Sequence, residues 1–236
     1  MDDPHLDEAR HRAALIGLAR LNRFTFVAPA IYRRIRKCAL ALRRPLKVLD
    51  IATGSGDMPI YWARKAKGER LPIDFTGIDL SPTALQVATS SAERASVDVH
   101  FMQRDVLADR LPSGFDVITC GLFIHHLDNA QIIKLLQSMQ AAANHAMIIC
   151  DLERSPLNLS CVWFAAHAVT RSPIVHRDAV RSVKAALTRQ EFASLASQSL
   201  GRPVRVEGLP PCRFIATIDE ATARAPEVAL AGVHAT

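Results

Sequence analysis

The 236-residue sequence has little of what defines several special classes of protein. It contains only 10 glycines and is 49% hydrophobic, which excludes a collagen-like or a disordered chain. The five cysteines are odd in number and have no paired spacing, so we expect neither a disulfide framework nor a metal site. The longest apolar stretch, 157–169, is interrupted by polar residues and is shorter than the roughly 20 residues that span a bilayer.

The sequence also lacks the basic start of a secretory signal. Its first nine residues carry four acids and no base. A signal peptide would begin with a positively charged region, so we expect a cytoplasmic protein.

Acidic residues are absent between positions 10 and 47, where eleven lysines and arginines occur. Such a segment is attracted to nucleic acid, to anionic lipid or to an acidic partner, or it is simply a solvated helical face. Only Phe24, Phe26 and Tyr32 interleave aromatic rings with these charges, fewer than a nucleic-acid platform would carry. We therefore expect no nucleic-acid partner, and peripheral membrane contact through 10–47 stays open.

The hydrophobic pattern predicts helices over 6–42, with a break near Pro29 and with Leu15, Leu18 and Leu21 on one face. From residue 46 onward, strands alternate with helices, which predicts a parallel sheet with right-handed crossovers. The expected strands are 46–51, 73–79, 97–102, 115–121 and 147–151. Three helices are expected between these strands. The first ends near Lys67, the second runs over 82–94 with Ser81 and Pro82 at its start, and the third runs from the capping residue Asp128 to about Ala143.

After the fifth strand comes a long insertion, at about 152–187. Thr188 and Glu191 form a capping box that begins another helix, and 204–207 and 214–219 are two closing strands. We expect three regions: a helical extension at 1–44, a domain at 45–219 that carries the insertion, and a flexible tail at 220–236.

The most informative stretch is Val-Leu-Asp-Ile-Ala-Thr-Gly-Ser-Gly-Asp, residues 48–57. It predicts a strand that feeds a glycine turn and then a helix, which is where open α/β sheets bind ligands. Pro59 occupies the third glycine position of the dinucleotide pattern, and no phosphate-binding Gly-Lys-Ser/Thr follows. Asp50 and Asp57 would repel a phosphate at this helix start and attract a cation. A ligand with an adenosine and a positive charge fits better.

Acidic residues end three successive strands. Asp50 is followed by Asp79, which lies 23 residues past Gly56, and by Asp105. A carboxylate at the second position can accept both ribose hydroxyls, and Asp105 with Val106 beside it suits an adenine ring. Each acid alone is explained as a helix cap or a loop residue, but three behind one glycine turn favour a nucleoside site.

With these motifs the chain resembles class I S-adenosylmethionine-dependent methyltransferases over about 45–150. Residues 48–57 resemble the first motif in the branch near the ubiquinone and menaquinone C-methyltransferases, where an Asp often replaces the third glycine. Gly-Ile-Asp-Leu-Ser-Pro (77–82) resembles the ribose-binding motif, and 115–127 resembles the fourth-strand motif that faces the substrate.

The resemblance implies an α/β, Rossmann-like fold: a seven-stranded, mostly parallel sheet with the last strand antiparallel and helices on both faces. It also implies S-adenosylmethionine as cofactor and S-adenosylhomocysteine as product. Gly54 and Gly56 would lie near the methionine part, Asp50 near its ammonium, Asp79 at the ribose and Leu80 on the adenine. The remaining implied cofactor residues are Ala52, Thr53 and Asp57 in the first motif, Asp105 and Val106 at the adenine edge, and Cys120 close to the sulfonium.

The acceptor is expected to be small and apolar, phenolic, polyketide-like or quinone-like, and methylated on oxygen or carbon. A base helps if a hydroxyl or activated carbon must lose a proton. The candidates are His125, His126 and His176, although the first two could instead hold their loop and the third could lie in a surface turn. Asp-Leu-x-Arg-Ser (151–155), Arg-Ser-Pro (171–173) and Ser-Val-Lys (182–184) resemble a group of small-molecule methyltransferases, some of them of polyketide-type pathways, but His176 and Arg177 stand in reversed order.

Covering segments are expected on both sides of the cofactor. Val162, Trp163, Phe164 and Val169 suit a lid or the inner face of an ordinary helix, and Leu21, Asn22 and Phe26 would cover the other side.

Two other functions stay open: a nucleic-acid or protein methyltransferase that uses 10–47, and a cofactor-binding regulator without catalysis. The sequence lacks the Asn/Asp-Pro-Pro-Tyr/Phe motif of amino-directed enzymes. The chain is expected to be a monomer or a homodimer.

Overall fold

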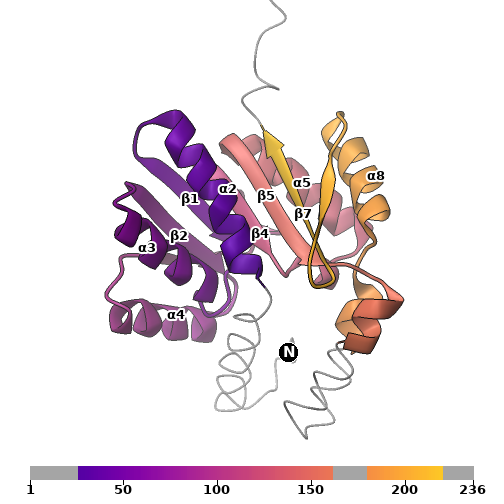
Figure 1. The fold of residues 1–236 in the computed structure, drawn as a ribbon, viewed down its shortest axis with the longest axis horizontal. Coiled ribbons are helices and arrows are strands. Elements are labelled where there is room, and N and C mark those ends of the chain that lie inside the picture. The colour runs from indigo at the N-terminus through magenta and orange to yellow at the C-terminus, as the bar shows by residue number, and fades with distance from the viewer. Residues whose placement is uncertain (1–25, 162–179, 220–236) are drawn as a thin grey trace, which may run out of the picture.

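The computed structural model describes residues 26–161 and 180–219. Seven strands form one sheet, with helices packed on both faces (Figure 1). The strands are β1 (Leu46–Ile51), β2 (Ile73–Asp79), β3 (His100–Gln103), β4 (Phe115–Gly121), β5 (Ala143–Leu152), β6 (Val206–Leu209) and β7 (Arg213–Asp219). The helices whose two ends are described are α2 (Val27–Leu42), α3 (Asp57–Glu69), α4 (Pro82–Arg94), α5 (Asn129–Ala142) and α8 (Arg189–Leu200), together with the short 3-10 helix η1 (Ile124–His126). Residues 156–161 and 180–185 are also helical.

The strand order is β3-β2-β1-β4-β5-β7-β6, and every neighbouring pair from β3 to β5 is parallel. Strand β7 runs antiparallel to both β5 and β6. This confirms the predicted fold class. One edge of the sheet therefore collects the carboxyl ends of β1, β2, β4 and β5 and also the start of β7.

Two hydrophobic clusters fill the space between the sheet and its helices. One joins α2 and α3 to the sheet, and the other joins α5 and α8 to the opposite face. Helix α4 contacts α3 and the strands β2 and β3. The cluster under α2 includes Val27, Ile31 and Ile35, all fully or almost fully buried.

The expected helix break near Pro29 corresponds to a helix boundary at Phe26, which has a positive φ of 56°. Helix α2 begins two residues before Pro29 and continues to Leu42. Proline is tolerated in the first helical turn because the N–H that it lacks would have no partner within the helix. The indole N–H of Trp62, on α3, donates to the Ala28 carbonyl at 2.8 Å and fastens this end of α2.

Strands β3, β5 and β6 have other bounds than predicted: β6 spans Val206–Leu209 rather than 204–207, and the bounds of β3 and β5 follow from pairing. Strand β3 starts at His100 rather than Val97, and it pairs only with β2 at the rim of the sheet. Strand β5 is longer than predicted because it pairs with β4 on one side and β7 on the other. The predicted leucine face at 15–21, Asn22, the apolar residues at 162–169, His176 and the tail lie outside the described residues. In the part of the chain that is described, no helix combines the length and the apolarity needed to cross a membrane.

Candidate active site

The glycine turn after β1 uses its two glycines differently. Gly54 and Gly56 both have a positive φ, of 57° and 71°. A Cβ on Gly56 would stand 2.8 Å from the Phe101 ring and 2.9 Å from the Ala88 Cβ, whereas one on Gly54 would meet no atom within 4 Å. Gly56 thus makes the close packing for which the dinucleotide pattern uses its third glycine. Gly54 leaves room beside the turn.

Asp79 at the end of β2 holds this turn. Its Oδ2 accepts a hydrogen bond from the Gly54 N–H at 2.7 Å, and its Oδ1 accepts one from the Ser81 N–H at 2.9 Å. Each carboxylate oxygen keeps a second lone pair for another donor. Leu80, the next residue, is 62% exposed although it is a large apolar side chain. A partly satisfied carboxylate and an open apolar side chain thus lie together at the strand end.

Asp50 lies deeper, with only 1% of its surface exposed. The hydroxyls of Thr53 and Thr119 each donate to one of its oxygens at 2.7 Å. Burial raises the pKa of the Asp50 carboxyl to about 7, although these two hydrogen bonds oppose the shift and the charges of Asp57 and Asp79 add to it. Asp50 therefore links the glycine turn, through Thr53, to β4, through Thr119.

Asp105 and Val106 follow β3. One oxygen of Asp105 accepts hydrogen bonds from the N–H groups of Leu107 and Ala108 at 2.8 and 3.1 Å, so this residue closes a local turn. Val106 is buried in the core. Cys120 is fully buried in β4, and burial raises the pKa of its thiol well above the ordinary value.

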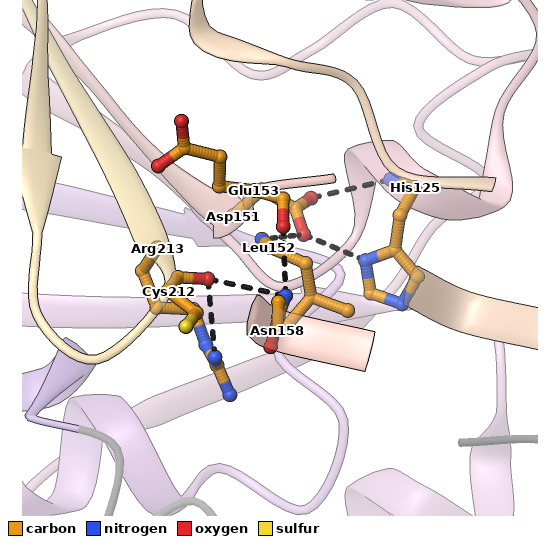
Figure 2. Close-up of polar contacts among 7 residues, drawn as sticks. All are labelled: His125, Asp151, Leu152, Glu153, Asn158, Cys212 and Arg213. Atoms are coloured by element: carbon orange, nitrogen blue, oxygen red, sulfur yellow. Dashed lines mark hydrogen bonds and ion pairs between the residues drawn. The ribbon is translucent and has the colours of Figure 1, made fainter. Parts of the chain in front are cut away.

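His125 forms a buried pair with Asp151 at the ends of β4 and β5 (Figure 2). The His125 Nδ1 lies 2.6 Å from the Asp151 Oδ1, and the His125 backbone N–H donates to the Oδ2 at 3.2 Å. Burial alone would raise the pKa of Asp151. The charge of His125 and the hydrogen bonds from His125 and Leu152 outweigh burial, so the pKa is lowered. Because Nδ1 faces the carboxylate, Nε2 is the nitrogen left to accept a proton.

Comparison with known proteins shows which family the stretch that contains most of these strand ends is similar to. The sequence model of a family described as "Methyltransferase domain" matches residues 48–146, which span the glycine turn, Asp79, Asp105 and His125. Residues 48–146 form a methyltransferase domain. This confirms, for this stretch, the predicted resemblance to the class I S-adenosylmethionine-dependent methyltransferases near the quinone methyltransferases.

The relatives of the methyltransferase domain include quinone enzymes. The chain is 35% identical over 101 residues to demethylmenaquinone methyltransferase from Thermus thermophilus, covering 42% of this chain and 44% of that protein. It is 25% identical to ubiquinone biosynthesis O-methyltransferase from Ralstonia nicotianae, covering 69% and 66%. The match thus spans about half to two thirds of these relatives' lengths.

A solved structure shows the same fold. The plantazolicin methyltransferase BpumL, in complex with a monoazolic desmethylPZN analog and SAH, superposes with a TM-score of 0.66. It is 18% identical, and the alignment covers 88% of this chain and 89% of BpumL. At this identity the likeness concerns the fold.

The methyltransferase domain gathers most of the predicted site residues at one edge of the sheet. Ala52, which has a positive φ of 54°, and the buried Thr53 lie in the turn, and half-buried Asp57 starts α3. His126 is exposed, and its ring centroid lies 4.1 Å from that of His125.

Two residues of this edge were not predicted. Asp151 was read only as part of a sequence resemblance, although an acid directly after a buried strand is the same signal that singled out Asp50 and Asp79. Arg213 begins β7 and reaches the edge only because β7 is antiparallel. No local pattern in the sequence marks it.

Proposed function

We propose that this chain transfers a methyl group from S-adenosylmethionine to a hydroxyl of a small aromatic acceptor. One observation carries the proposal: within the stretch that matches the methyltransferase family, Asp79 bonds the Gly54 N–H and stands beside the exposed Leu80. Asp57 at the start of α3 disfavours a phosphate there, so a cofactor with a nucleoside and a positive charge fits the site.

The residues on the cofactor side would have different roles in binding the cofactor. Asp79 would accept the ribose hydroxyls with its remaining lone pairs, and Leu80 would lie on the adenine. Asp105 and Val106 would face the adenine edge, while the room beside Gly54 would admit the methionine part. Asp50 would act through the turn that it fixes, since both of its oxygens already bind threonine hydroxyls. When bound, the cofactor supplies an electrophilic methyl group that the protein need not activate.

The residues of the acceptor side favour a hydroxyl acceptor. Asp151 holds the imidazole of His125 through Nδ1, so that Nε2 is directed away from the carboxylate and can take a proton. A hydroxyl must lose its proton as it is methylated, and a positioned imidazole assists that step. The quinone methyltransferases among the relatives support a small aromatic acceptor.

Calorimetric titration with S-adenosylmethionine and S-adenosylhomocysteine tests the cofactor assignment. The Asp79→Ala variant should bind both more weakly by about 1–3 kcal/mol, because it removes a partly buried hydrogen-bonding carboxylate. Asp74→Ala is the matched control, since Asp74 lies on the same strand, is exposed and should leave the affinity unchanged. Equal affinity in the Asp79 variant would remove this residue from the site, and no binding by the unchanged protein would refute the proposed function.

A further inference from the structure

Arg213 lies at the same edge of the sheet as the His125–Asp151 pair. It pairs with Leu152 across β5 and β7, one position beyond the pair of Asp151 with Phe214. In Figure 2 its guanidinium and the His125 ring extend toward the same side, with Asn158 between them in this view. The amide of Asn158 donates to the carbonyls of Glu153 and Cys212 at 2.8 and 3.3 Å, which ties the segment after β5 to the turn before β7.

The hydrogen bonds of Arg213 satisfy only part of its guanidinium. Nη1 donates to the backbone carbonyls of Pro211 and Cys212 at 3.1 and 3.3 Å. The buried Nε has no hydrogen-bond partner, and no carboxylate of the described residues forms an ion pair with this arginine. Burial lowers the pKa of Arg213, the charge of Asp151 opposes this shift, and the guanidinium stays charged. A cation that is mostly withdrawn from solvent and has no ion pair is costly, and an anion would compensate it.

Two other arginines of the described residues, Arg34 and Arg189, have the carboxylate partners that Arg213 lacks. Arg34, also mostly buried, donates to the Glu207 carboxylate at 2.8 Å, to the Thr217 hydroxyl at 3.0 Å and to the Ala30 carbonyl at 3.3 Å. Arg189, which is half exposed, pairs with Glu153 at 2.7 Å. Asp151, the acid at the end of β5, is already bound to His125. Arg34 and Arg189 therefore have carboxylate counter-ions, whereas Arg213 keeps unused donors.

We infer that Arg213 binds a carboxylate carried by the aromatic acceptor. A guanidinium presents parallel N–H donors that match a carboxylate, and a charge-assisted pair in a buried place is strong. The inference rests on the proposed function and extends it: the acceptor presents a hydroxyl to His125 and an anionic group to Arg213. It names an acceptor class, the hydroxylated aromatic acids.

The test compares one acid with its neutral ester. Protein saturated with S-adenosylhomocysteine is titrated calorimetrically with protocatechuate, a dihydroxybenzoic acid, and with its methyl ester. The unchanged protein should bind the acid at least about tenfold more tightly than the ester. Arg213→Met should abolish this preference and leave the affinity for S-adenosylhomocysteine unchanged. Arg213→Lys should retain part of the preference, and the control Arg189→Gln should retain all of it.

A thermal melt of the same variants separates binding from a structural role. Arg213→Met removes a buried charge and should melt at the same or a higher temperature than the unchanged protein. A lower melting temperature with the preference intact would make Arg213 an anchor of the 210–212 turn and overturn the inference. The inference also fails if the unchanged protein shows no preference for the acid, including binding of neither compound. Failure to bind S-adenosylhomocysteine would instead refute the proposed function, and this inference with it.

Discussion

Three carboxylates at the same edge of the sheet differ in what their oxygens already bind. Asp50 is enclosed by two threonine hydroxyls, Asp79 holds two backbone N–H groups, and Asp151 holds an imidazole. Asp50 therefore stabilises the turn, and Asp79 retains capacity for a ligand. Asp151 fixes which nitrogen of His125 is free. Under the proposed function, the same residue type would thus serve structure, binding and proton transfer within one edge.

Replacing His125 by glutamine tests its role as a base. We expect kcat for methylation of protocatechuate to fall about 10²- to 10⁴-fold, because the acceptor hydroxyl then loses its proton unaided. The affinity for S-adenosylhomocysteine should not change, since His125 lies on the acceptor side.

Two further variants complete this test. Asp151→Asn should also lower kcat and alter its pH profile, because it acts by positioning His125. His100→Gln, an exposed histidine on β3, is the control. If His125→Gln kept a normal kcat, the pair would serve only to hold η1 in place.

The elements that the sequence predicted well are those with local signals. Ser81 accepts from the Ala84 N–H at the start of α4, and capping boxes at Asp128 and Thr188 begin α5 and α8 as their sequences indicate. A cap depends on residues within one turn, so it can be read directly. Boundaries of β3 and β5 depend on partners far along the chain, and their lengths could not be read in this way.

Helix α2 should be a structural part of the fold. Ile35 is fully buried under it, whereas Arg33 lies on its exposed face. Ile35→Ala should lower the free energy of unfolding by about 2–5 kcal/mol through the cavity that it creates. Arg33→Ala should change it by no more than about 0.5 kcal/mol. Urea unfolding of the two variants checks this, and equal small effects would mean that α2 contributes little to the core.

For the whole molecule, the alternation of strands and helices was enough to predict the parallel sheet and its acidic edge. The role of the basic leading segment was not predictable. Within residues 26–47, Arg34, Arg36 and Arg44 form ion pairs with Glu207, Glu69 and Asp116. Those partners are distant in sequence. Part of the charge in the leading segment thus serves to attach α2 and the segment after it to the sheet and to α3.

The stability of the whole protein should depend on pH through Asp50. Its pKa is about 7 in the folded state against an ordinary 3.8, so between these values the folded protein holds a proton that the unfolded chain releases. The contribution of Asp50 to the free energy of unfolding is fully present below pH 3.8 and is lost as the pH rises toward about 7.

The Asp50→Asn variant does not titrate at this position and isolates the effect. Its melting temperature relative to that of the unchanged protein should increase from about pH 4 to about pH 7 and then level off. Asp74→Asn, on an exposed part of β2, is the control and should show no such trend. A constant difference across this range for Asp50→Asn would contradict the buried, protonated carboxyl.

The strand order has a consequence for how such a protein can diversify. The proposed cofactor residues Gly54, Asp79 and Asp105 all precede β4 in the sequence, whereas His125, Asp151 and Arg213 all follow it. The β6–β7 hairpin returns the chain to the shared edge from the far rim. Under the proposed function, substitutions after β4 would change the acceptor, while the residues before β4 would continue to bind the methyl donor.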